Sequence, residues 1–172
     1  NASSLFFADP VIFEQELLSS LGIEPAEISS QIVPPEPMLR LVQELGNIAG
    51  IMANLVRDLR NLQRTEIGEA GEAFGTLQVG SSTMAQKQNP ITFENIESDW
   101  KIVYGYVIGH LVTAMLDQIS DHQRDLTNSA SSRTYVEIVG YIAYMVKRLT
   151  KALAKLQVHR EHCEANLRLS GD

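Results

Sequence analysis

Residues 36–64 read EPMLRLVQELGNIAGIMANLVRDLRNLQR, and this stretch decides the fold. Its apolar residues recur at alternating intervals of three and four, which places them in one stripe along an α-helix. The stripe contains Met38, Leu41, Leu45, Ile48, Met52, Leu55, Leu59 and Leu62. At about 1.5 Å per residue such a helix is roughly 40 Å long, so it can bury this stripe only against other long helices.

Two more helical patterns of similar length follow, at residues 93–120 and 135–167. Their stripes contain Ile96, Trp100, Val103, Val107, Leu111 and Ala114, then Ile138, Ile142, Met145, Leu149, Leu153 and Leu156. A shorter helix is expected at residues 11–21, where Asp9 and Pro10 supply an N-cap and a first helical residue. Strand alternation is absent, so the sequence predicts an all-α fold, an elongated bundle of long helices. The stripes are too long to be buried within one chain, which also predicts a homo-oligomer.

The composition limits the partners that this protein can have. The 172 residues are 44% hydrophobic and 20% charged, which is typical of a globular domain rather than a disordered chain. The net charge of −7 argues against a nucleic-acid partner. The single cysteine, Cys163, excludes a disulfide framework and favours a reducing, cytoplasmic location. No apolar run approaches the roughly 20 residues of a membrane span, so we expect no membrane partner.

One polar stretch, GSSTMAQKQNP at residues 80–90, interrupts the helical patterns. It has almost no apolar residue to bury, and the glycines at positions 75 and 80 can act as hinges. Its hydrogen-bond donors and its positive charge suit an anionic, oxygen-rich ligand; they are Ser81, Ser82, Thr83, Lys87 and Asn89. A solvated glycine-serine linker is the alternative interpretation, and these residues alone leave both open.

The spacing Gly-Ser-Ser-x-Met-x-x-Lys-x-Asn-Pro, with a glutamate four residues after the proline, resembles the signature loop of the fumarase/aspartase lyase superfamily. The resemblance implies β-elimination that releases fumarate from a succinyl-bearing substrate. It implies that Ser81 is the catalytic base and that Lys87 and Asn89 hold the carboxylate that gains negative charge. By the same resemblance Glu94 orients a catalytic histidine from another segment, and Ser82 and Met84 contact the substrate.

A second stretch, HQRDLTNSASSR at residues 122–133, is similar to the phosphate-binding segment of the adenylosuccinate lyases, a branch of this superfamily. The resemblance implies that Arg124, Ser129 and Arg133 bind the phosphate of a nucleotide substrate. Two guanidinium groups and a hydroxyl at a break between long helices suit that role. From the residues alone, the alternative is a simple helix end, capped by residues 128 and 129.

Together the two stretches imply a carbon–nitrogen lyase of purine nucleotide biosynthesis. Its substrates would be adenylosuccinate and the related succinyl-aminoimidazole carboxamide ribotide, and it would use neither a metal nor a cofactor. The alternatives are a non-catalytic helical oligomerisation module and a sibling such as an argininosuccinate lyase. Four positions depart from the family pattern, where other residue types are usual: Pro35, Ala85, Gln86 and Gln88.

The resemblance begins near residue 31 and covers most of the chain. Members of the superfamily are more than twice as long, have three domains and assemble as tetramers. The resemblance therefore implies that residues 1–172 are one helical-bundle domain, the central one, with the signature loop at 80–90. The first domain, which carries the general-acid histidine, and the third domain are not visible in this sequence. We expect the chain alone to be inactive, and its partners to be a small anionic nucleotide and other copies of itself, most simply in a homotetramer.

Overall fold

The computed structural model describes residues 9–26, 35–74, 88–116 and 129–171. It divides the chain into two units, residues 1–33 and 34–172, which are described separately here. In the first unit, helix α1 spans Pro10–Ser20. The Asp9 carboxylate caps it by accepting hydrogen bonds from the backbone N–H groups of Val11 at 3.0 Å and Ile12 at 3.2 Å. The expected short helix is therefore confirmed, whereas the prediction of a single domain over residues 1–172 stays a prediction.

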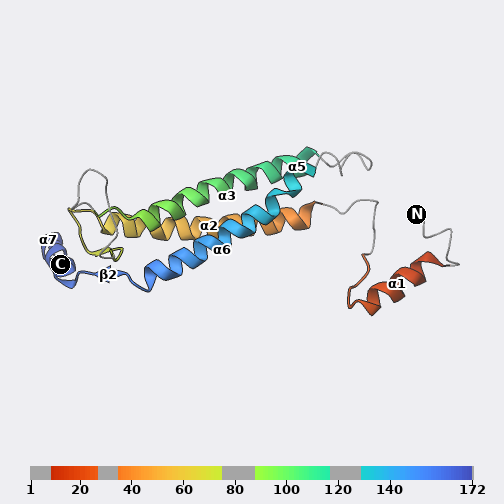
Figure 1. Ribbon diagram of the computed structural model, residues 1–172, viewed down its shortest axis with the longest axis horizontal. Coiled ribbons are helices and arrows are strands. Elements are labelled where there is room, and N and C mark those ends of the chain that lie inside the picture. Colours follow the sequence, from red (N-terminus) through yellow and green to blue (C-terminus); the bar gives the residue numbers. More distant parts are fainter. Residues whose placement is uncertain (1–8, 27–34, 75–87, 117–128, 172) are drawn as a thin grey trace. The chain divides into compact units, whose positions relative to one another are not determined.

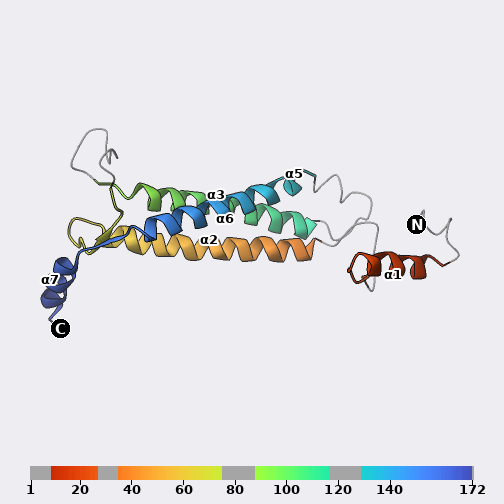
Figure 2. The ribbon, with the colours of Figure 1, turned by 60° about the horizontal axis from the view of Figure 1, so that its bottom comes forward.

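The second unit is a bundle of three long helices, α2 (Glu36–Leu62), α3 (Ile91–Leu116) and α6 (Thr134–Leu153). They lie side by side in Figures 1 and 2, with the short helix α5 (Ser129–Ser132) directly before α6. The buried core between them contains Val42, Ala49, Met52, Val56, Leu59, Phe93, Ile96, Val103, Val107, Ile138, Met145 and Leu149. The prediction of an all-α fold with a helical bundle is confirmed.

The core stripe of α2 agrees with the predicted one only in part. Met52 and Leu59 are buried as predicted. Leu41, Ile48 and Leu55 are 40–48% exposed, and the residues that follow them, Val42, Ala49 and Val56, are buried instead. The core uses these smaller residues because α2 and α3 approach closely. The larger apolar residues Leu41, Ile48 and Leu55 form a second stripe, which is exposed on the surface of this chain.

The third predicted helix, residues 135–167, is wrong as a continuous element. Helix α6 ends at Leu153, and helix α7 (Arg160–Ser170) begins after a break. In the break, strand β2 (Gln157–Val158) pairs antiparallel with strand β1 (Ala70–Gly71), with Ala70 opposite Val158. The strand pairing satisfies the backbone of the connection after α2, and this long-range gain outweighs the local helical pattern. A membrane-spanning helix is not found among the residues that the structure describes.

Candidate functional site

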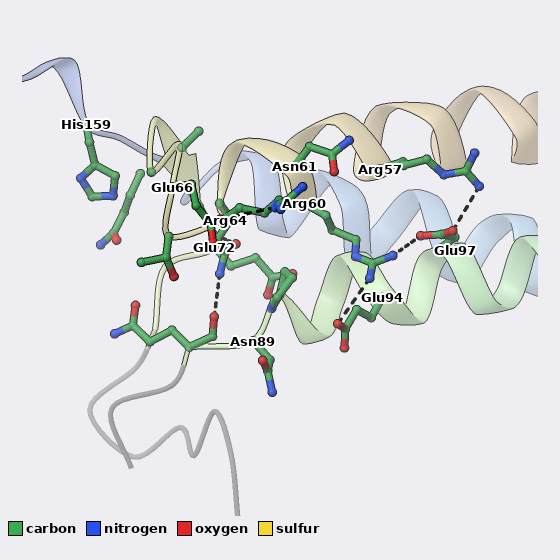
Figure 3. A pocket seen from close by; sticks show the side chains of 18 residues that line it. Arg57, Arg60, Asn61, Arg64, Glu66, Glu72, Asn89, Glu94, Glu97 and His159 are labelled. Atoms are coloured by element: carbon green, nitrogen blue, oxygen red, sulfur yellow. Dashed lines mark hydrogen bonds and ion pairs between the residues drawn. The ribbon is translucent and has the colours of Figure 1, made fainter. Parts of the chain in front are cut away.

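A cavity of about 1020 Å³ lies where α2 ends and α3 begins (Figure 3). Its lining is rich in charged and amide side chains. The lining includes Arg57, Arg60, Asn61, Gln63, Arg64, Glu66, Glu72, Gln88, Asn89, Glu94, Glu97, Gln157 and His159. These residues come from the end of α2, the connection after it, the start of α3 and strand β2. The lining thus combines guanidinium and amide groups, which can donate to the anionic oxygens of a ligand, with carboxylates that pair with the arginines.

Two arginines of α2 hold the carboxylates of α3 that face the cavity. Glu97 accepts hydrogen bonds from Arg57 Nη2 at 3.1 Å and from Arg60 Nη1. Arg60 also forms an ion pair with Glu94, with 3.6 Å between Nη2 and Oε1. Burial by itself raises the pKa of Glu97, but the hydrogen bonds and positive charges of the two arginines outweigh it and lower the pKa below its ordinary value. Glu97 is therefore a structural carboxylate, fully engaged by its two partners.

Glu94 differs from Glu97, because its side chain is 46% exposed and its ion pair with Arg60 is long. It lies on the first turn of α3, one turn before Glu97, and faces the same cavity (Figure 3). A carboxylate in this position can accept a hydrogen bond from a group that enters the cavity. The role that the resemblance implies for Glu94 stays a prediction.

Asn89 lies directly before α3 and lines the same cavity as Glu94. Its carbonyl oxygen accepts a hydrogen bond from the N–H of Ile91 at 2.8 Å, which forms the turn into the helix. Pro90 between them has a fixed φ, which suits the position just before a helix begins. The structure therefore brings together two of the predicted site residues, Asn89 and Glu94.

The backbone on either side of Asn89 is held by Gln63 and Glu72. Gln63 Nε2 donates to the carbonyl oxygen of Gln88 at 3.0 Å, and Gln63 Oε1 accepts from the N–H of Glu72 at 3.0 Å. The Glu72 carboxylate accepts from the N–H groups of Thr92 at 3.2 Å and of Phe93 at 2.7 Å. Glu72 itself is only 6% exposed. One glutamine and one glutamate thus join the end of α2, the connection after it and the start of α3.

Sequence reasoning missed Arg57, Arg60, Gln63, Glu72 and Glu97. Their contacts join α2 to α3, and side chains at the end of an amphipathic helix look solvated when a sequence is read alone. One signal was available: charged and amide residues concentrate just where the apolar stripe of α2 stops.

Five of the predicted site residues lie outside the residues that the structure describes, and their roles stay predictions. They are Ser81, Ser82, Met84, Lys87 and Arg124. Two of the departures from the family pattern, at positions 85 and 86, also lie outside the described residues.

Ser129 begins α5, and Arg133 is exposed in the turn between α5 and α6. Thr134, next to Arg133, has its Oγ1 2.7 Å from Nε2 of His110, far along α3. At about 1.5 Å per residue, His110 lies roughly 24 Å along the helix axis from Glu94. The start of α3, which carries Glu94, and the start of α6, which Arg133 precedes, lie at opposite ends of the bundle (Figures 1 and 2). The structure does not bring the predicted phosphate-binding residue Arg133 to the cavity of its own chain.

Residues 6–105 match the sequence profile of a family described as lyase. The chain belongs to this lyase family. This membership confirms the resemblance to the fumarase/aspartase superfamily that was identified from the signature loop.

Similar curated proteins are adenylosuccinate lyases. The adenylosuccinate lyase of Archaeoglobus fulgidus is 34% identical over 165 residues, which cover 95% of this chain and 36% of that protein. The one of Methanothermobacter thermautotrophicus is 39% identical over 153 residues, which cover 88% of this chain and 33% of that protein. The lyase chain described here thus spans about a third of the length of the curated relatives it matches.

A solved structure supports the fold of this lyase chain. It is the crystal structure of 3-carboxy-cis,cis-muconate lactonizing enzyme from Pseudomonas putida, which superposes with a TM-score of 0.71 over 90% of this chain and 34% of that one. The two are 19% identical, so the likeness concerns the fold alone.

Proposed function

We propose that the natural protein containing this chain is a carbon–nitrogen lyase that releases fumarate from adenylosuccinate by β-elimination, and that this chain is its central helical domain. The observation that carries the proposal is the meeting of Asn89 and Glu94 at one cavity lined by arginines. Membership of the lyase family and similarity to adenylosuccinate lyases support it. The related succinyl-aminoimidazole carboxamide ribotide, which carries the same succinyl group, is the second proposed substrate.

The proposed reaction removes a proton and an amine from neighbouring carbons of the succinyl group. Ser81 takes the proton from the carbon next to a carboxylate, and the electron pair of that C–H bond forms the new C=C bond of fumarate. The C–N bond breaks, and a general acid, a histidine, protonates the nitrogen that leaves with the nucleotide. Lys87 and Asn89 stabilise the carboxylate while it gains negative charge, because donors aimed at developing charge lower the barrier most. Glu94 orients the general-acid histidine by accepting a hydrogen bond from its ring.

The phosphate of the nucleotide is proposed to bind Arg124, Ser129 and Arg133, and Ser82 and Met84 are proposed to contact the rest of the substrate. Arg133 lies at the end of the bundle opposite Glu94, so a complete site needs this residue from another copy of the chain. The exposed apolar stripe of α2 and similar residues of α3, such as Ile108 at 53% exposure, offer surfaces for such copies. A homotetramer with two-fold axes is the simplest assembly that buries these stripes.

The test is fumarate release from adenylosuccinate by the full-length natural protein. Ser81→Ala should lower kcat by about 10²–10⁴-fold, because a catalytic base is lost, with little change in KM. Arg133→Ala should instead raise KM, because a phosphate contact acts through binding. Ser98→Ala, on the exposed surface of α3, is the matched control.

Two outcomes would contradict the proposal. A wild-type protein that releases no fumarate refutes the function and favours a non-catalytic oligomerisation module. A protein that releases fumarate equally well after Ser81→Ala keeps the function but refutes the base.

A further inference from the structure

Asn89 is fixed from both sides by contacts to its neighbours in the chain. On one side, the carbonyl oxygen of Gln88 accepts the hydrogen bond from Gln63. On the other, the N–H groups of Thr92 and Phe93 donate to Glu72. The side chains of Gln63 and Glu72 are thus bonded to main-chain groups directly before and shortly after the candidate site residue. A shift of either side chain would move the backbone that carries Asn89.

Gln63 makes a bridge that few side chains can make. Its amide nitrogen donates to Gln88, and its amide oxygen accepts from the N–H of Glu72. Glutamate has no donor for the first bond, and leucine has neither group. The space around the amide is also tight, because a Cβ added at Gly71 would lie 3.2 Å from Gln63 Cδ. The position of Gln63 is therefore set by packing as well as by hydrogen bonds.

Glu72 caps the N-terminal end of α3 through its carboxylate. A carboxylate that is 6% exposed carries a large desolvation cost unless it is hydrogen-bonded. Here both oxygens accept N–H groups of the first turn of α3, where the helix dipole also favours a negative charge. Phe93, one of the two donors, is fully buried in the core. Glu72 thereby locks the first turn, from which Glu94 projects to the cavity.

We propose that Gln63 and Glu72 are positioning residues of the lyase reaction: they hold the backbone of residues 88–93 so that Asn89 and Glu94 meet at the cavity. This inference rests on the proposed function and extends it to two residues that need no contact with the substrate. Their effect on rate comes through geometry, since a misplacement of about 1 Å can cost about 100-fold in rate.

The experiment uses the full-length protein with Gln63→Leu and Glu72→Gln. Gln43→Leu, on an exposed position of α2, and Glu164→Gln, on an exposed position of α7, are the matched controls. Fumarate release is measured per folded protomer, well below the unfolding midpoint, together with hydrogen exchange of the peptide containing residues 88–94. We expect both site variants to lower kcat by about 10- to 100-fold, to change KM little and to speed exchange of this peptide, whereas the controls do none of these.

A third variant tests the geometry without altering either hydrogen-bonding side chain. Gly71→Ala adds only a methyl group, which presses on Gln63 at 3.2 Å. We expect a smaller fall in kcat than for Gln63→Leu, with the same direction of change in exchange. If Gly71→Ala also left kcat and exchange unchanged, the bridge would be too adaptable for a positioning role.

The outcomes separate this inference from the function on which it rests. If the wild-type protein releases no fumarate, the proposed function and the positioning role fail together. If it releases fumarate and the variants keep its kcat, only the positioning role fails, whatever the exchange shows. A fall in kcat without faster exchange of residues 88–94 would also overturn the inference, because Gln63 and Glu72 would then act on the substrate directly.

Discussion

Asn89 and Arg133 lie on one chain but at opposite ends of the bundle, and this separation predicts that two inactive variants can rescue each other. Glu94, close to Asn89, and His110, which contacts Thr134 beside Arg133, are roughly 24 Å apart along α3. If both ends serve one substrate, each site must take Asn89 from one copy and Arg133 from another. Asn89→Ala on one copy and Arg133→Ala on another then leave some sites with both residues intact.

The expected size of the rescue follows from the fraction of sites that contain both intact residues. Asn89→Ala removes a donor to the developing charge and should lower kcat/KM by about 100-fold. Arg133→Ala removes a charged hydrogen bond and should lower it by roughly 10- to 100-fold. In randomly mixed oligomers, roughly a quarter of the sites receive both intact residues, so their activity should approach a quarter of the wild-type value. That is roughly 25-fold above the Asn89→Ala protein alone.

The assay is co-expression of the two variants with different affinity tags, followed by purification on both tags. Fumarate release at low adenylosuccinate concentration is then compared with that of each variant expressed alone, purified with both tags in the same way. A mixed oligomer that is no more active than the mean of the two single variants would show that the sites do not combine Asn89 and Arg133 from different copies. The reasoning from the length of α3 would then be refuted.

Three further predictions concern stability, measured by urea unfolding at fixed protein concentration. Gly46→Ala should destabilise the protein by about 1–2 kcal/mol, because the added Cβ would lie 2.9 Å from a methyl group of Val107. Gly50→Ala should stabilise it by up to about 1 kcal/mol, because the nearest atom to the added Cβ is 3.7 Å away; equal effects of the two substitutions would contradict the packing argument. The pKa of Glu97 is lowered in the folded state, so the stabilising effect of its charge is present above the ordinary glutamate pKa of about 4.3 and is lost as pH falls through the folded value. The difference in unfolding free energy between the wild type and Glu97→Gln should therefore shrink on acidification. Burial lowers the pKa of His110, so the wild type should lose stability relative to His110→Phe as pH falls below about 6.5; a constant difference would contradict it.

The sequence predicted those parts of the fold that depend on local pattern. The long helix over residues 36–64 was expected and is observed as Glu36–Leu62, because its apolar period and the preceding prolines act locally. The break after Leu153 was missed, because it depends on the pairing of Ala70 with Val158, and these residues are distant in sequence. The core stripe on α2 was predicted only in part: Met52 and Leu59 are buried as expected, but Val42 and Val56 replace Leu41 and Leu55. Periodicity shows that a helix has an apolar face but not which neighbour covers it.

The residues of the candidate site also fall into those that the sequence predicted and those that it did not. Asn89 and Glu94 belong to a motif with fixed spacing, so they could be named before the structure was known. Arg60, Gln63 and Glu72 carry no such spacing. Their contacts are with groups of residues 72 and 88–97, and only the packing of the chain brings these groups within hydrogen-bonding distance.

The short pairing of β1 with β2 has a consequence for how the protein is made. On a ribosome that adds about 5–20 residues per second, Gly71 emerges several seconds before Gln157 and His159. Helices α2 and α3 can pack during that interval, but the connection at residues 69–71 has no partner until the later segment arrives. His159, whose N–H bonds to the carbonyl oxygen of Glu69 at 2.8 Å, then closes one wall of the cavity. A nascent chain can therefore form much of the helical bundle while its cavity is still unfinished, which leaves ligand binding to the last stage of its folding.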